Sequence, residues 1–161
     1  SRAGIALAVA HLALVGSLGL KLFTDRATLP RGWARTVPVD PSLPIRGRYV
    51  SLRLAIPVPA GPVDHAKTLQ GIRLRAVEGR LVGEVDDQAG TAMRLDSVNG
   101  SLLASLAEPV AYFIPEQVPD PSLRPAGEEL WAEVTIPRRG PPRPIRLGIM
   151  KNGGITPLEL R

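Results

Sequence analysis

The chain opens with its longest apolar run. Residues Ala3 to Leu20 carry no formal charge, and Leu22 and Phe23 extend the run past Lys21. At 1.5 Å per residue, a helix over this stretch reaches about 30 Å, the thickness of a bilayer's hydrocarbon core. The pattern therefore predicts a transmembrane anchor over residues 1–23. A cleaved signal peptide is the alternative, although signal h-regions are usually shorter and a small-x-small cleavage site is not well placed after Leu20.

The rest of the chain consists of short apolar segments separated by turn residues. Residues 24–44 contain spaced prolines and predict an extended connector with one short strand around Thr36 to Val39. Apolar and polar residues then alternate, as in half-buried strands, over Tyr49–Ile56, Ile72–Ala76, Leu81–Val85, Leu130–Ile136, Ile145–Ile149 and Ile155–Leu160. The first of these strands is expected to end at Pro57, and Glu78-Gly79 predicts a hairpin between the second and third.

Two further segments complete the predicted fold. Ala111 to Ile114 is expected to form an edge strand ending at Pro115, and Ser101 to Leu106 is a weak helix candidate. Strands of this length at intervals of ten to twenty residues are typical of all-β domains. The sequence thus predicts a mainly β domain over residues 45–161, an antiparallel sandwich or small barrel preceded by a single N-terminal transmembrane helix.

The amino-acid composition excludes several classes of catalytic and metal site. Cysteine is absent and histidine occurs twice in 161 residues, which excludes disulfides, thiol nucleophiles and three-histidine metal sites. The acid pairs Asp86-Asp87 and Glu128-Glu129 stand in turn-like contexts, and Asp64-His65 lies in a loop without a nucleophile serine. No phosphate-binding or zinc motif is present. We therefore predict no catalytic residue, no cofactor and no metal site, and expect that the chain is not an enzyme.

The basic charge is spread along the chain. A net charge of +5 arises from 20 lysines and arginines against 15 acids, and the closest approach to a cluster is Arg138, Arg139, Arg143 and Arg146. Nucleic-acid-binding proteins usually concentrate such residues on one face, and aromatic residues are only 4% here. No nucleic-acid partner is expected. Two interpretations of the arginines stay open, a coding bias and contact with an anionic membrane surface.

Two segments carry a resemblance to a known family. Residues 38–54 read PVDPSLPIRGRYVSLRL and place Arg46, Gly47, Tyr49 and Leu52 at signature positions. Residues 111–116 read AYFIPE and add Tyr112, Phe113, Pro115 and Glu116. The chain resembles the GDYXXLXY family of bacterial proteins in both segments. It departs from the signature at Arg48, which replaces an acid, and at Leu54, which replaces a second tyrosine.

The resemblance implies a single-pass protein of the bacterial cytoplasmic membrane with an extracytoplasmic, periplasmic β domain and no established activity. Such proteins are often found beside multi-spanning membrane proteins, so the implied partners are membrane lipid and another integral membrane protein. The flanking charges oppose this orientation. Arg2 precedes the span while Lys21, Arg26, Arg31 and Arg35 follow it, which by the positive-inside rule places the domain in the cytoplasm.

The motif residues have a structural and a functional interpretation. Gly47 permits a bulge or positive φ, and Tyr49 is expected to cover the edge of the core. A strand cannot bury Tyr112, Phe113 and Ile114 on one face, because successive side chains point to opposite faces. Either a second layer covers the side chain on the outer face, or that side chain belongs to a partner surface. The loop over residues 117–125 is expected to be too rigid to collapse onto the core. The favoured function is a membrane-anchored binding or accessory module; the alternatives are docking on anionic lipid and, less favoured, a membrane-proximal enzyme.

Overall fold

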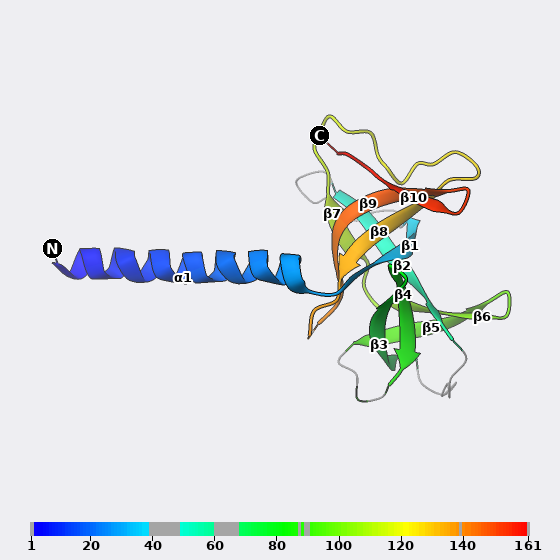
Figure 1. Cartoon of the computed structure of the whole chain (residues 1–161), viewed down its shortest axis with the longest axis horizontal. Coiled ribbons are helices and arrows are strands. Elements are labelled where there is room, and N and C mark those ends of the chain that lie inside the picture. The colour runs from blue at the N-terminus through cyan, green and yellow to red at the C-terminus, as the bar shows by residue number, and fades with distance from the viewer. Residues whose placement is uncertain are drawn as a thin grey trace.

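A long helix projects from a compact β domain (Figure 1). The computed structural model describes residues 2–38, 49–59, 68–86, 88, 91–138 and 140–160. Helix α1 spans Arg2–Thr28, and an 18-residue segment within Arg2–Asp25 has a mean hydropathy of 2.0 with none of it buried inside the structure. The helix is therefore long and apolar enough to cross a membrane, a property that it shares with signal sequences.

The described part of the expected connector, residues 24–38, forms the end of α1 and strand β1 instead. Helix α1 continues to Thr28, where the Thr28 hydroxyl donates to the Thr24 carbonyl and the Arg31 guanidinium donates to the Ala27 carbonyl. Strand β1 (Arg31–Pro38) begins after two intervening residues and includes the described part of the short strand expected from Thr36. The prolines did not prevent this, because Pro30 stands between the two elements and Pro38 ends the strand.

Within the described residues the domain has ten strands. After β1 these are β2 (Tyr49–Val58), β3 (Gln70–Val77), β4 (Arg80–Val85), β5 (Ala92–Val98), β6 (Ser101–Leu106), β7 (Val110–Phe113), β8 (Glu129–Thr135), β9 (Arg143–Lys151) and β10 (Gly154–Pro157). Strand β2 extends past the expected stop, since Pro57 pairs with Leu103 of β6. Each alternating segment named from the sequence coincides with a strand, although β8 ends one residue before Ile136 and β10 ends at Pro157 rather than at Leu160.

Six strands close into a small barrel, which is one of the two predicted architectures. Their order is β1-β4-β3-β5-β6-β2, and the ring closes because β1 pairs antiparallel with β2 and parallel with β4. The β1–β4 link is short and centres on Trp33, whose amide donates to the Gly79 carbonyl at 2.8 Å. Strand β1 is therefore both the first strand of the domain and the strand that closes the barrel.

The remaining strands extend from this ring. Strands β8, β9 and β10 continue the sheet outward from β1, and β7 lies at the opposite end of the strand order, beside β2. Strands β6 and β7 follow the same edge of β2 one after the other, from Val58 back to Tyr49. The expected edge strand over Ala111–Ile114 is confirmed, as β7 ends the sheet.

The barrel interior is filled by one face of each strand. Leu52, Leu54 and Ile56 of β2 are completely buried, together with Ile72 of β3 and Leu81 of β4 at 1% exposure. Alternation along β2 produces this arrangement, because successive side chains point to opposite faces of a strand. The core of the domain is therefore closed without any contribution from α1.

One predicted element was wrong. Residues Ser101–Leu106 form strand β6 rather than a helical turn, in a hairpin with β5. Its turn is Asn99-Gly100 with φ of 51° and 78°, the left-handed geometry of two-residue hairpins. The same geometry occurs at Glu78-Gly79, where the hairpin expected from the sequence is confirmed. Leu102 to Ala104 mask the strand pattern because both faces of β6 carry apolar residues.

Candidate interaction surfaces

The two segments of the family-like motif lie side by side. Strand β7 pairs antiparallel with the first half of β2, with Tyr49 opposite Phe113 and Leu52 opposite Val110. The Tyr49 and Phe113 rings are 6.3 Å apart between centroids and tilted by 54°, which is within the range of favourable aromatic pairs. The described parts of the two motif segments are thus joined by the β2–β7 pairing at the end of the sheet.

The described motif residues divide into core and surface. Leu52 is completely buried, and Tyr112 is half-buried against the core. Tyr49 and Pro115 are half-buried, while Phe113 and Glu116 are exposed. Arg46 and Gly47, with the departure at Arg48, lie outside the described residues, so the expected bulge or positive φ at Gly47 is not addressed by the structure. The sequence placed Tyr49 and Phe113 in separate segments, and only the β2–β7 register joins them.

Of the two interpretations of Tyr112, Phe113 and Ile114, the fully buried strand is wrong. Ile114 is 8% exposed, but Phe113 is 71% exposed on the outer face of β7. The following loop also departs from expectation, because Pro121 is among the fully buried residues. Leu123, two residues later, is 76% exposed. The edge of the sheet therefore presents a large aromatic side chain to its surroundings without a covering layer among the described residues.

The four arginines grouped in the sequence have different environments. Arg146 on β9 lies opposite Glu133 on β8, and its Nε and Nη2 donate to Glu133 Oε2 at 2.9 and 2.8 Å. The guanidinium carbon also lies 5.5 Å from the centre of the Trp33 ring. Glu133 is 6% exposed, so this acceptor is buried and paired. Arg146 therefore stabilises the outer sheet and is not part of a free basic surface.

Trp33 occupies this network because its neighbour has no side chain. A Cβ at Gly148 would lie 2.8 Å from two carbons of the Trp33 ring. The indole is half-buried against β9, with the Arg146 guanidinium over its face. Trp33 is therefore a packing residue of the outer sheet. A similar stack places the Arg80 guanidinium 5.6 Å from the Trp131 ring centre.

Arg138 and Arg143 lie instead where the helix joins the domain. A cavity of about 500 Å³ is lined by Lys21, Asp25, Thr28 and Leu29 of the α1 region, by Pro137 and Arg138 of the β8–β9 connection, and by Arg143 at the start of β9. Figure 1 shows this connection, in orange, beside the end of α1. Sequence reasoning missed this meeting of Lys21 with the arginines, because the two segments are more than a hundred residues apart. Arg139 lies outside the described residues.

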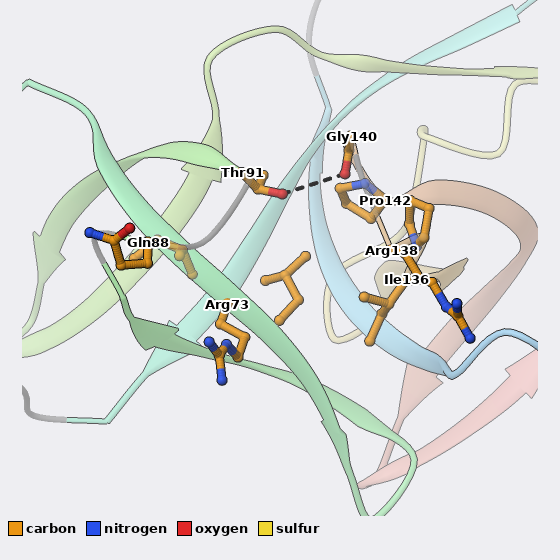
Figure 2. Close-up of a pocket in the computed structure, with 10 residues that line it drawn as sticks. Arg73, Gln88, Thr91, Ile136, Arg138, Gly140 and Pro142 are labelled. Carbon is orange, nitrogen blue, oxygen red and sulfur yellow. Dashed lines mark hydrogen bonds between the residues drawn. The ribbon is translucent and has the colours of Figure 1, made fainter.

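A second cavity lies on the other side of the β8–β9 connection. It has a volume of about 270 Å³, and its walls include Arg73 and Gln88 on one side and Ile136 and Arg138 on the other. Figure 2 shows the Thr91 hydroxyl donating to the Gly140 carbonyl across it, at 3.4 Å. The Arg138 side chain points away from Arg73 and Gln88 in this view. One long hydrogen bond thus links the two sides of this cavity, and the Arg138 guanidinium does not face Arg73 across it.

The described members of the two acid pairs considered from the sequence, Asp86, Glu128 and Glu129, have ion-pair partners; Asp87 lies outside the described residues. Asp86 pairs with Arg73, Glu129 with Arg35 at 2.9 Å, and Glu128 with Lys151 at 3.2 Å. Asp64 and His65 lie outside the described residues. In the part of the chain that the structure describes, no three His, Asp or Glu side chains come together as a metal site. The described acids therefore act as members of surface ion pairs.

Comparison of the chain with protein-family models, with curated proteins and with solved structures gave no match. The resemblance of residues 38–54 and 111–116 to the GDYXXLXY family therefore stays a prediction.

Proposed function

We propose that the chain is a membrane-anchored binding or accessory module that remains attached to the bilayer through α1. The proposal rests on one observation. Every large apolar residue of α1 is exposed, from 49% at Leu22 to 73% at Phe23, while the β domain closes its own core. Such a helix has no role in the domain's interior, and a lipid environment is the one that satisfies it.

Hydrogen bonds of two polar side chains in the middle of α1 support a helix that stays in the membrane. The His11 ring nitrogen lies 3.2 Å from the Leu7 carbonyl, and the Ser17 hydroxyl donates to the Leu14 carbonyl at 2.8 Å. These polar side chains find acceptors on their own helix, which reduces the cost of placing them in hydrocarbon. One ring nitrogen of His11 and the Ser17 hydroxyl are therefore satisfied within the helix itself.

Following the family resemblance, we assign the β domain to the extracytoplasmic side of a bacterial cytoplasmic membrane. The chain has no cysteine, so Ser101→Cys introduces a unique and exposed thiol at the start of β6. A membrane-impermeant maleimide should label it in intact cells. Labelling only after lysis would place the domain in the cytoplasm, as the flanking charges predict. Ser105→Cys, at a position 8% exposed, is the matched control and should stay unlabelled while the domain is folded.

The partner surface proposed for this module is the patch of Tyr49 and Phe113 on β2 and β7. Strand β7 ends the sheet and carries a 71% exposed phenylalanine, so both an open strand edge and an aromatic side chain are available. Exposed edges of this kind are places where another chain adds to a sheet. Since the domain is held near the bilayer, another integral membrane protein is the partner expected.

Site-directed photocrosslinking tests this surface. A benzoylphenylalanine at position 113, in the full chain in its native membrane, should give one product of defined mass. The same probe at Val77, which is 49% exposed on the β3–β4 hairpin, is the control and should give none. No product at position 113, or the same products at both positions, would contradict a partner at β7.

A further inference from the structure

The junction between α1 and the barrel lies at a definable depth in the membrane. About 20 residues at 1.5 Å per residue cross a hydrocarbon core of about 30 Å, so a span beginning at Ala3 ends near Phe23. The headgroup layer adds roughly 5–8 Å on each side. Asp25 and Leu29, which line the 500 Å³ junction cavity, fall within or just beyond this layer. The cavity is therefore placed among lipid headgroups, whichever side of the membrane holds the domain.

The helix faces the domain across this cavity. Residues 2–24 of α1 are exposed, and Asp25 and Leu29 are the first to be half-buried. Four residues apart, they lie on one face of the helix end. The opposite wall is formed by Pro137, Arg138 and Arg143. The two walls are thus contributed by the membrane anchor and by the β8–β9 connection.

The charges lining the cavity favour an anion. Lys21, Arg138 and Arg143 are opposed by one carboxylate, Asp25. Among the described residues, none of these three cations has an acidic partner within 4 Å, unlike Arg35, Arg73, Arg75 and Arg146, which are paired. Thr28 adds a hydroxyl, although it already donates to the Thr24 carbonyl at 2.8 Å. An excess of unpaired cations beside a membrane helix remains to be balanced.

We propose that this junction cavity binds the phosphate of an anionic phospholipid headgroup. Arginine presents several donors to phosphate oxygens, and Lys21 can extend its ammonium group from the edge of the core toward the headgroup layer. Phospholipid is the occupant because the helix itself brings the cavity to the depth of the phosphates. Binding there fixes the angle between α1 and the barrel, since one ligand contacts both walls. The inference rests on the anchor of the proposed function but not on the Phe113 surface.

The test uses the full chain reconstituted in nanodiscs with equal amounts of phosphatidylcholine and phosphatidylglycerol. The protein is then transferred to a mild detergent, and the retained lipids are counted by native mass spectrometry. We expect several-fold more phosphatidylglycerol than phosphatidylcholine on the wild type. The double variant Arg138→Gln/Arg143→Gln should lose this preference, and Asp25→Asn should increase it because the opposing carboxylate is removed.

A matched control variant distinguishes lipid binding at the cavity from a general effect of the net charge of the protein. Arg53→Gln/Arg94→Gln removes the same two charges at exposed positions of β2 and β5 that do not line the cavity, and it should keep the wild-type preference. Equal retention of both lipids by the wild type, or equal loss in the two double variants, would overturn the proposal. Failure of the chain to enter nanodiscs would contradict the anchor instead, so the two failures are distinguishable.

Discussion

Helix α1 and the barrel interior contain the same types of apolar side chain, but these are exposed in the helix and buried in the barrel. Leu12 and Leu14 of the helix are 72% and 70% exposed, whereas Leu52 and Leu54 of β2 are completely buried. The barrel buries the apolar side chains of its core, whereas no described part of the domain covers the apolar side chains of the helix. The difference teaches that the apolar residues of the barrel are satisfied by the fold itself, while those of α1 need a partner outside it, which under the proposed function is lipid.

The largest expected effect comes from removing the same side chain in each region. Leu54→Ala leaves a cavity in the closed barrel and should lower the free energy of unfolding by about 2–5 kcal/mol. Leu12→Ala, in the exposed helix, should leave the unfolding of the domain unchanged. Chemical unfolding of the full chain in detergent, followed by β-sheet circular dichroism, measures both. Similar losses in the two variants would mean that α1 packs on the domain and is not lipid-facing.

Adding a methyl group, instead of removing side-chain atoms, also distinguishes the packed barrel from the exposed helix. A Cβ at Gly83 of β4 would lie 2.9 Å from Ile72 Cγ2 and 3.1 Å from Val58 Cγ2, inside the barrel. Gly83→Ala should therefore destabilise the domain by about 1–3 kcal/mol. Nothing lies within 4 Å of a Cβ at Gly16, so Gly16→Ala is the matched control and should not change domain melting. An unchanged melting temperature for Gly83→Ala would contradict the closed packing of β3 and β4.

Sequence patterns located these two regions because each depends on local periodicity. The uncharged run ending at Leu20 defined α1, and the alternation of Val50, Leu52 and Leu54 defined the buried face of β2. Ser101–Leu106 failed because adjacent apolar residues hide the period of two, although Asn99-Gly100 carried the hairpin signal. Strand β5 was not predicted for a related reason, as it is mostly exposed outside Met93.

Long-range pairing accounts for what the sequence did not show. Closure of the barrel depends on β1 meeting both β2 and β4, and no local pattern encodes a parallel contact between Trp33 and Arg80. The separate roles of Arg146 and Arg138 likewise follow from register. Glu133 stands opposite Arg146 in the β8–β9 pair, while Arg138 lies in the connection beyond the ladder. A continuous cluster in the sequence was thus divided by the fold.

Two ion pairs, one with a buried acceptor and one exposed, should differ in the same direction, with a smaller effect on the free energy of unfolding. Glu133→Gln removes the charge that accepts two donors from Arg146 in the outer sheet, and it should cost about 1–2 kcal/mol of stability. Glu84→Gln affects an ion pair with Arg75 at 2.8 Å whose side chains are each 58% exposed. That variant should cost about 0–1 kcal/mol. Urea unfolding of both compares them, and equal effects would contradict a structural role for the Arg146 pair.

Phe113 gives a small expected effect on stability, because its side chain is largely exposed although it belongs to the domain. Its 71% exposure matches that of residues in α1. Phe113→Asp should lower stability by about 0.5–1 kcal/mol through the lost ring contact with Tyr49. Tyr112→Asp, at a half-buried position that packs on the core, should lower it by more. If both variants unfold the domain equally, Phe113 is a packing residue and not part of a partner surface.

The depth of α1 in a bilayer tests the central claim most directly. Because the chain has no cysteine, single cysteines from Ile5 to Leu29 can each carry a nitroxide label in the full chain in liposomes. Paramagnetic relaxation by oxygen and by a water-soluble nickel chelate then reports depth at each position. A span centred in the membrane predicts the highest oxygen accessibility near Leu12 and Ala13, falling to high nickel accessibility beyond Asp25. A flat profile with high nickel accessibility along the whole helix would contradict a membrane anchor.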